Sequence, residues 1–184
     1  GIDEAAFYGP KLDIQCKNVF GKEDTIVTIQ VDMLLAKKFG MEYTDSNDQR
    51  VTPYIIHRTS LGCYERTIAL LIEKYGGALP TWLSPEQVRI HPITEDQNEY
   101  AEEIKKKLLR CGFRPEVDSR YEKIGFKIRE AQLEKVPYML VVGAKEMEEG
   151  KVAVRSRKEG DLGAIALDEF IAKLHEEVDN KVCK

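Results

Sequence analysis

The clearest pattern in the chain is Ile56-His57-Arg58-Thr59-Ser60-Leu61-Gly62-Cys63-Tyr64-Glu65-Arg66. It predicts a strand that passes through a glycine-containing turn into a helix. The helix is indicated by apolar residues at helical spacing: Tyr64, Ile68, Leu71, Ile72 and Tyr75. At roughly 100° per residue, Arg66 lies about 200° around the helix from Tyr64 and points away from the apolar face. The pattern therefore presents a guanidinium group at a strand–helix junction, beside a glycine that would let a ligand approach the backbone.

The chemistry of Arg66 allows two interpretations. A guanidinium group is planar and always charged, which suits binding to a polyphosphate. Glu65 and Arg66 could equally form a surface ion pair or be solvated separately, as is common for such pairs. This stretch alone leaves both interpretations open.

The residues before the helix predict part of an antiparallel sheet. Residues 12–16 and 25–31 are rich in β-branched side chains and largely alternate in polarity, and Gly21-Lys22 suits a hairpin connection between them. Residues 51–56 form a further strand pattern, which Pro53 interrupts. A few strands and one helix leave exposed faces and edges, so this part is expected to depend on neighbours.

The residues after Gly76-Gly77 alternate between strand and helix patterns. Strands are indicated at 87–93, 113–117, 138–143 and 151–157, with a hairpin turn at Glu149-Gly150 before the last of them. Helices are indicated after a Thr94/Gln97 capping box, over 124–131 and over 167–178. This order predicts a three-layer α/β domain with a mixed sheet. We expect domains at 1–80 and 87–184, joined by a linker at 81–86.

Composition places the chain among globular proteins of a reducing compartment. Its 184 residues are 42% hydrophobic, with a net charge of −4. No stretch is long and apolar enough for a membrane span or resembles a signal peptide, so a cytoplasmic location is expected. The four cysteines are scattered without CxxC spacing, which favours free thiols. The first residue is glycine, which suggests a fragment.

Several stretches together resemble one family. Residues 56–66 resemble the third signature motif of class II aminoacyl-tRNA synthetases, and residues 6–11 and 28–32 resemble two further blocks of the threonyl-tRNA synthetases. Residues 122–130 and 150–157 resemble the anticodon-binding domain of the same family. The blocks cover nearly the whole chain in order. The resemblance implies the end of a class II catalytic domain followed by an anticodon-binding domain.

The resemblance assigns roles to four residues of the first part. Arg66 would bind ATP, used with Mg²⁺, while Tyr8 and Gln30 would contact threonine. His57 would be one of three ligands of a catalytic-site zinc, whose other two ligands are not found in this chain. Without the resemblance, His57 is a partly buried strand residue and Tyr8 an aromatic residue before a Gly-Pro turn. Gln30 is the stronger candidate, because an amide in an apolar strand needs partners.

The resemblance also implies a set of anticodon-binding residues. These are Arg120, Tyr121, Glu122, Lys123, Arg129, Glu146 and Arg155. Tyr121 departs from the family pattern, which has an asparagine there, so stacking on a base would replace a hydrogen bond. Arg155 and Arg157 share one strand face and could read nucleotides, or could protect an edge strand by charge. Lys127 is expected on the solvated face of its helix.

The function implied is ligation of threonine to its tRNA with ATP, by a parent enzyme that is expected to be a homodimer. The alternative is a non-catalytic synthetase-like protein or accessory RNA-binding module. Departures from the family pattern at Tyr121 and around Thr25 favour the alternative, and those at Met33 and Ala36 leave a divergent paralogue open. His57, Gln30 and Arg66 favour the enzyme.

We predict that this chain by itself neither activates threonine nor holds stoichiometric zinc, because two of the three implied zinc ligands and the first two class II motifs are not in it. Threonine-dependent pyrophosphate exchange and metal analysis of the purified chain measure both properties. Exchange at a rate near ordinary synthetase turnover would contradict the prediction.

Overall fold

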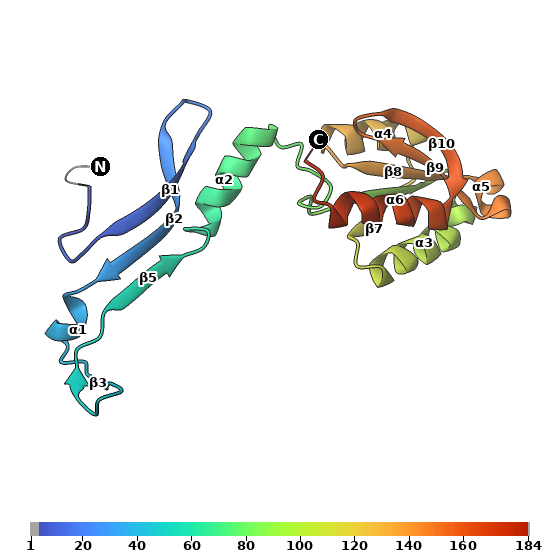
Figure 1. The fold of residues 1–184 in the computed structure, drawn as a ribbon. Helices are drawn as coiled ribbons and strands as arrows, with labels where there is room; N and C mark the ends of the chain where they lie inside the picture. The colour runs from blue at the N-terminus through green and yellow to red at the C-terminus, as the bar shows by residue number, and fades with distance from the viewer. Residues whose placement is uncertain (1–3, 184) are drawn as a thin grey trace. The chain divides into compact units, whose positions relative to one another are not determined.

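The computed structural model describes residues 4–183, which divide into two compact units at the Lys74–Tyr75 bond (Figure 1). Each unit is described by itself below. None of the helices in the described part of the chain has the length and apolar character that a bilayer span requires.

The first unit is built on a three-stranded antiparallel sheet, in the order β1-β2-β5. The strands are β1 (Lys11–Lys17), β2 (Glu23–Asp32) and β5 (Ile55–Thr59). A short helix α1 (Leu35–Lys38) and a small hairpin of β3 (Tyr43–Thr44) and β4 (Arg50–Val51) lie between β2 and β5 in sequence, and helix α2 (Tyr64–Tyr75) follows. The predicted antiparallel sheet is confirmed, and Pro53 separates β4 from β5.

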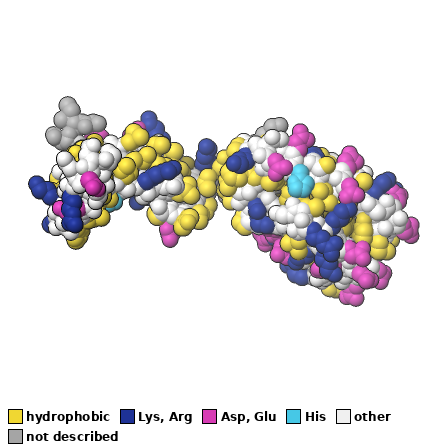
Figure 2. Space-filling view, turned by 60° about the horizontal axis from the view of Figure 1, so that its bottom comes forward, with side chains coloured by type: hydrophobic (Ala, Val, Ile, Leu, Met, Phe, Trp, Pro, Cys, Tyr) yellow, Lys and Arg dark blue, Asp and Glu magenta, His cyan; other side chains and the backbone are white. Residues whose placement is uncertain are grey.

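The apolar side chains of the first unit are largely uncovered. Ala36 is the one buried apolar residue among residues 4–74. On α2, Tyr64 is 75% exposed, Ile68 54% and Ile72 50%. Figure 2 shows hydrophobic side chains over much of the visible surface of this unit. Because apolar burial is the main stabilising contribution in folding, the unit gains little stability from its own residues.

The second unit is a five-stranded mixed sheet in the order β10-β9-β8-β6-β7. Its strands are β6 (Val88–Pro92), β7 (Pro115–Val117), β8 (Tyr138–Val142), β9 (Lys151–Ser156) and β10 (Gly160–Ala166). β6 pairs in parallel with β7 and β8, while β9 is antiparallel to both of its neighbours. The helices are η1 (Glu95–Gln97), α3 (Asn98–Arg110), α4 (Ile124–Leu133), α5 (Ala144–Glu149) and α6 (Leu167–Asp179). The predicted three-layer domain with a mixed sheet is confirmed.

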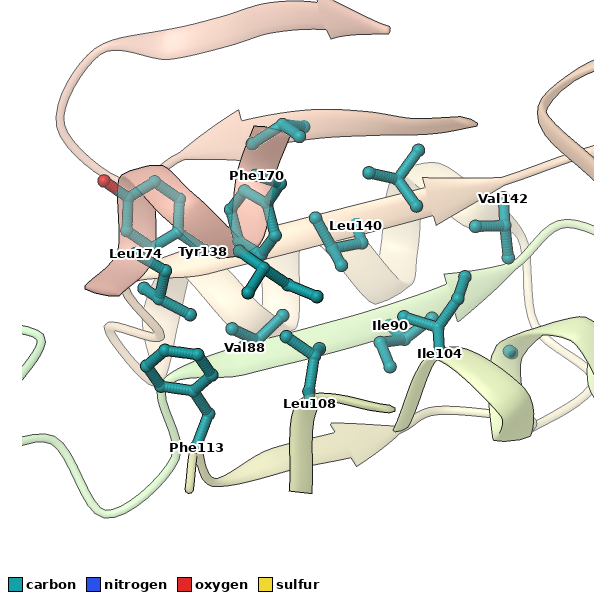
Figure 3. Close-up of a cluster of buried hydrophobic side chains, with 14 residues drawn as sticks. Val88, Ile90, Ile104, Leu108, Phe113, Tyr138, Leu140, Val142, Phe170 and Leu174 are labelled. Carbon is teal, nitrogen blue, oxygen red and sulfur yellow. The ribbon is translucent and has the colours of Figure 1, made fainter. Parts of the chain in front are cut away.

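Two hydrophobic clusters lie on opposite faces of this sheet. Alternate strand residues such as Val88, Leu140 and Val154 pack with α3 and α6 in the larger cluster (Figure 3). Met139 points to the other face and packs against α4 residues. A central strand buried on both faces should be continuously apolar, which explains the unbroken Tyr138–Val142 sequence.

The connection between β8 and β9 differs from the predicted hairpin turn at Glu149-Gly150. It contains the short helix α5, which ends at Gly150 in the left-handed conformation. The hairpin instead joins β9 to β10, a strand that the sequence pattern missed because its two glycines give it low intrinsic strand propensity. β9 is therefore an interior strand, and the edge-strand interpretation of Arg155 is wrong.

The segment that precedes β6 packs onto the second unit. Arg114 donates from its guanidinium group to the Ser84 carbonyl oxygen at 3.0 and 2.8 Å, and Arg157 donates to the Leu79 carbonyl oxygen at 2.9 Å. The Thr81 hydroxyl donates to Glu177 of α6 at 2.6 Å. Residues 81–86, expected as a linker, are thus hydrogen-bonded to the second unit.

We predict that a protein covering residues 75–184 is more stable than one covering 87–184. The shorter version lacks the Ser84 and Leu79 carbonyl groups that accept from Arg114 and Arg157 and the Thr81 hydroxyl that donates to Glu177, at a cost on the order of 1 kcal/mol per hydrogen bond. Urea unfolding followed by circular dichroism measures the difference. Equal unfolding midpoints would show that the segment contributes nothing.

Candidate functional site

Strand pairing in the first unit brings together three residues that the sequence assigned to amino-acid and metal binding. Gln30 on β2 lies directly opposite His57 on β5. The Tyr8 hydroxyl donates to the Gln30 side-chain oxygen at 2.8 Å, and the rings of Tyr8 and His57 are 6.4 Å apart between centroids. The backbone at Gly9 permits this approach: a Cβ atom there would lie 1.9 Å from the Val31 carbonyl oxygen, so only glycine fits. Three residues from three segments therefore form one polar cluster.

Asp32 belongs to this cluster, although sequence reasoning missed it. Its buried carboxylate accepts hydrogen bonds from the Leu34 and Leu35 backbone N–H groups at 2.9 and 2.8 Å, and lies 3.2 Å from His57 Nε2. The pKa of Asp32 lies below its ordinary value, and the largest cause is the hydrogen bond from the Leu35 backbone N–H. The signal in the sequence was an acidic residue two positions after Gln30, at the end of an apolar strand. A carboxylate in this place orients the His57 ring.

His57 is the residue that the sequence assigned to metal binding. Within residues 4–183, no three His, Cys, Asp or Glu side chains come close enough together to hold a metal ion. The His57 side chain is 44% exposed, and its Nε2 atom faces Asp32. The ring therefore offers one nitrogen, Nδ1, for a metal.

Arg66 extends from α2 toward β2, where its guanidinium group donates to the Thr25 carbonyl oxygen at 3.2 Å. A β-bulge in the β1–β2 pair leaves Ile26 outside the regular register. Gly62 has a φ of 63°, and a Cβ atom there would lie 3.0 Å from the Ile26 carbonyl oxygen. The glycine thus accommodates strand β2 itself, which differs from the expected role of admitting a ligand.

Arg66 and Gln30 line the same surface hollow, of about 420 Å³. Lys11, Asp13, Thr28 and Thr59 also line it. The hollow is polar and open along the sheet, and it places a guanidinium group and a carboxamide in one cavity. Such an arrangement can hold an anionic group and a polar group of one ligand.

A second hollow lies in the second unit, where the parallel strands end. The chain leaves β6 toward α3 and leaves β7 toward α4, and these helices cover opposite faces of the sheet. In open α/β sheets, ligands bind at such a change of direction, beyond the carboxyl ends of the strands. The hollow measures about 500 Å³. Its lining includes Thr94, Asn98, Arg120, Tyr121, Glu122 and Lys123.

Arg120 in this hollow is held by two carboxylates. It donates to both oxygens of Asp118 at 2.8 Å and to Glu130 at 2.5 Å. The hydrogen bonds from Arg120 lower the pKa of Asp118 to about 2. Arg120 is therefore an oriented cation, about half exposed, rather than a mobile one.

Tyr121, Glu122 and Lys123 lie exposed at the start of α4. Tyr121 is 94% exposed, so its ring is available for stacking on a planar group. Lys123 precedes the first helical residue, where backbone N–H groups lack helical partners. The rim of the hollow thus combines an aromatic face with a cationic helix start.

Lys127 is buried, so the expectation of a solvated side chain is wrong. It is 3% exposed, and its ammonium group donates to the carbonyl oxygens of Asp118 at 2.9 Å and Pro92 at 3.3 Å. The helical pattern did not reveal this, because Lys127 faces the ends of β6 and β7 rather than the apolar cluster under α4.

His91 lies beside Lys127 and Asp118 and is fully buried. Within residues 4–183, neither ring nitrogen has a hydrogen-bond partner, and Nδ1 is 3.7 Å from Asp118 Oδ2. Burial, opposed by Asp118, lowers the pKa of His91 to about 4. The ring is therefore neutral near pH 7.

The three remaining candidates lie outside the lining of this hollow. Arg129 is exposed on α4. Glu146 accepts the Gly143 backbone N–H at 3.0 Å and caps α5. Arg155 lies opposite Met139 in the sheet, with a terminal nitrogen 3.6 Å from Asp161 and a buried Nε that has no partner among the residues that the structure describes. Arg157 follows β9, and its guanidinium group donates to the backbone carbonyl oxygens of Ala78 and Leu79.

We predict that the second unit loses stability as the pH falls from about 6.5 toward 4. The pKa of His91 is about 4 in the folded state and ordinarily 6.5, so the unfolded state binds more protons in this range. The free energy of unfolding should fall by up to about 3 kcal/mol, at roughly 1.4 kcal/mol per pKa unit. Urea unfolding, followed by the fluorescence of Trp82, the one tryptophan of the sequence, measures it.

The controls are His91→Gln, which should flatten the dependence, and His175→Gln, which should preserve it, since His175 is partly exposed on α6. Asp118 contributes little in this range because its pKa falls from 3.8 to about 2 on folding, so the stability it provides is complete above pH 4 and is lost only below it. A wild-type stability that does not change between pH 6.5 and 5 would contradict the prediction.

Comparison with known proteins assigns both units. Residues 2–75 match the tRNA synthetase class II core domain (G, H, P, S and T), and residues 87–177 match the anticodon binding domain family. The chain is 60% identical over 179 residues to a threonine–tRNA ligase of Clostridium botulinum (strain Eklund 17B) and 58% identical to one of Clostridium perfringens (strain SM101). These alignments cover 97% of this chain and 28% of each relative.

Solved structures agree with this assignment. The RNA binding domain of threonyl-tRNA synthetase from Cryptosporidium parvum matches with a TM-score of 0.83 and 38% identity, over 95% of this chain and 44% of that one. Prolyl-tRNA synthetase from the same organism, complexed with halofuginone and AMPPNP, matches with a TM-score of 0.77 and 26% identity, over 98% and 39%. The chain belongs to the threonyl-tRNA synthetase family and contains a class II core segment and an anticodon-binding domain.

Proposed function

We propose that this chain is the part of a threonine–tRNA ligase that supplies the third class II motif, one side of the threonine site and the anticodon-binding surface. The observation that carries this proposal is the cluster of Tyr8, Gln30 and His57, drawn together by strand pairing in a chain 60% identical to a threonine–tRNA ligase. The activity belongs to the longer protein, since the chain spans 28% of such relatives.

The reaction we propose has two steps. The threonine carboxylate attacks the α-phosphate of ATP, which releases pyrophosphate and forms threonyl-adenylate. A ribose hydroxyl of the tRNA then attacks the threonyl carbonyl carbon, which forms the ester and releases AMP. Catalysis of this kind depends on positioning and charge stabilisation. Arg66 would hold a phosphate of ATP in the hollow that it shares with Gln30. Arg66 could bind the phosphate while it still donates to the Thr25 carbonyl oxygen, or after it has released that hydrogen bond.

Gln30 and Tyr8 would position the threonyl group. Their mutual hydrogen bond leaves the Gln30 amide N–H groups as donors toward a ligand. His57 would supply one zinc ligand, and Asp32 would orient its ring, as carboxylates commonly do for metal-binding imidazoles. A zinc ion with an open position, when bound, would select for the hydroxyl of threonine over valine.

The second unit would bind the anticodon arm of threonine tRNA. Its second hollow offers Tyr121 for stacking and Lys123 for a phosphate, next to the fixed guanidinium group of Arg120. Unpaired loop bases are recognised by such stacking and by hydrogen bonds to their edges. Arg129, Glu146 and Arg155 would contact further nucleotides outside this hollow.

A non-catalytic RNA-binding protein is the second candidate. The presence of Arg66 favours the enzyme, but its contact favours this second candidate. The guanidinium group donates to the Thr25 carbonyl oxygen, in the region where the sequence departs from the family pattern, rather than being free for a phosphate. The reading frame upstream of Gly1 discriminates between the two. The first two class II motifs and a Cys-His pair of zinc ligands would favour the enzyme, and their absence would favour the RNA-binding protein.

We predict that Arg155→Ala weakens binding to a stem-loop with a threonine anticodon and narrows the gap to an anticodon-swapped stem-loop. A guanidinium group that pairs with a base edge contributes about 1–3 kcal/mol of discrimination, by analogy with DNA readout. The matched control is Arg110→Ala on α3, which covers the opposite face of the sheet. Fluorescence titration of both variants measures the effect.

Arg110→Ala should leave both affinities unchanged. Equal losses on the two RNAs for Arg155→Ala would reduce Arg155 to a backbone contact. Unchanged binding would remove it from the interface.

A further inference from the structure

Lys127 makes an unusual set of contacts at the second hollow. Its ammonium group is buried and donates to two backbone carbonyl oxygens, of Pro92 at the end of β6 and of Asp118 just after β7. The residues that follow these carbonyl groups, including Ile93, Thr94, Ser119 and Arg120, line two sides of the hollow. One side chain therefore links the starting points of two walls.

The same residue also connects the third wall. Lys127 belongs to α4, and its backbone N–H donates to the Lys123 carbonyl oxygen at 3.2 Å, in the first turn of the helix. Lys123 lies on the rim of the hollow. Strand pairing and the hydrogen bond from the Asp118 N–H to the Ile90 carbonyl oxygen already hold β7 against β6, and Lys127 adds hydrogen bonds that tie the ends of both strands to the start of α4.

Stability alone does not explain a buried lysine in this position. Within residues 4–183, the hydrogen bonds of the ammonium group go to carbonyl oxygens and none goes to a carboxylate; the Asp118 carboxylate, which is close enough to feel the charge of Lys127, is bonded to Arg120. Buried charges without such pairing are costly, and an apolar residue of similar volume often replaces a buried charge at no loss of stability. Neutral His91 adds no second charge beside it. What the ammonium group offers beyond packing is two directed hydrogen bonds to backbone groups.

We propose that Lys127 is a positioning residue for anticodon recognition: it fixes the backbone walls of the second hollow so that Thr94, Arg120 and Tyr121 are preorganised for RNA. This inference rests on the proposed function of the second unit. Lys127 itself lines the hollow, but its side chain is 3% exposed and its ammonium group is bonded to two carbonyl oxygens, so it acts through the walls rather than by contact with phosphate. Preorganisation of this kind lowers the cost of ordering the site on binding.

The test uses the full 184-residue chain with Lys127→Met, which keeps the side-chain length and removes the donors. Lys127→Gln, which keeps N–H donors without the charge, is the second variant. Ile104→Val on α3 is the matched control, because it loosens the core on the opposite face. Binding to threonine-anticodon stem-loops at two salt concentrations, thermal unfolding, and hydrogen exchange over residues 92–98 and 118–123 are measured.

We expect Lys127→Met to lose about tenfold in affinity, as small displacements of a binding group can cost, with faster exchange in both wall segments. Lys127→Gln should lose less affinity for the stem-loop than Lys127→Met. The slope of log affinity against log salt should stay at the wild-type value, since no phosphate contact is removed. Ile104→Val should lower the unfolding temperature and leave the affinity unchanged.

Four other outcomes would each refute part of this proposal. A wild-type chain that does not bind the stem-loop would refute the proposed function itself. Wild-type affinity in Lys127→Met would overturn the positioning role, and a reduced salt slope would make Lys127 a direct phosphate contact. An equal loss of affinity in Ile104→Val would assign the effect to general destabilisation.

Discussion

The second unit depends on one constraint, the burial of strand β6 on both faces between two parallel neighbours. Val88 and Ile90 pack into the larger hydrophobic cluster, while His91 on the opposite face is fully buried beside Asp118. A strand buried in this way has a neighbour on each side, and both neighbours of β6 are parallel to it. The carboxyl ends of β6, β7 and β8 therefore lie together at one edge of the sheet. The chain then departs to opposite faces of the sheet, and the hollow at this point follows from topology.

The first unit is organised differently. It has little buried apolar surface, and its polar cluster is held by strand register and hydrogen bonds. The pairing of Gln30 with His57 would change with any slip of β2 against β5, since a one-residue shift moves side chains to the other face. Asp32 limits such slippage by capping α1 and contacting His57. The cluster is thus precise in geometry although it sits on a weakly packed scaffold.

Several cationic side chains of this protein donate hydrogen bonds to backbone carbonyl groups. Arg114, Arg157 and Lys127 each donate to carbonyl oxygens at places where the chain leaves regular structure. Backbone carbonyl groups in such places need donors once water is excluded. These residues look like solvated or ligand-binding charges in the sequence, because nothing local distinguishes a lysine that reaches a carbonyl group from one that reaches water.

The sequence by itself determined the antiparallel strands, the alternating α/β part with its mixed sheet and the family, because these depend on local periodicity and on ordered blocks of residues. It also nominated Tyr8, Gln30 and His57, which the strand pairing brings together. Only the tertiary structure decided that β10 completes the sheet, that Asp32 joins the cluster and that Lys127 is buried. The physical reason is that a weak strand, a capping carboxylate and a buried ammonium group are each defined by partners distant in the sequence.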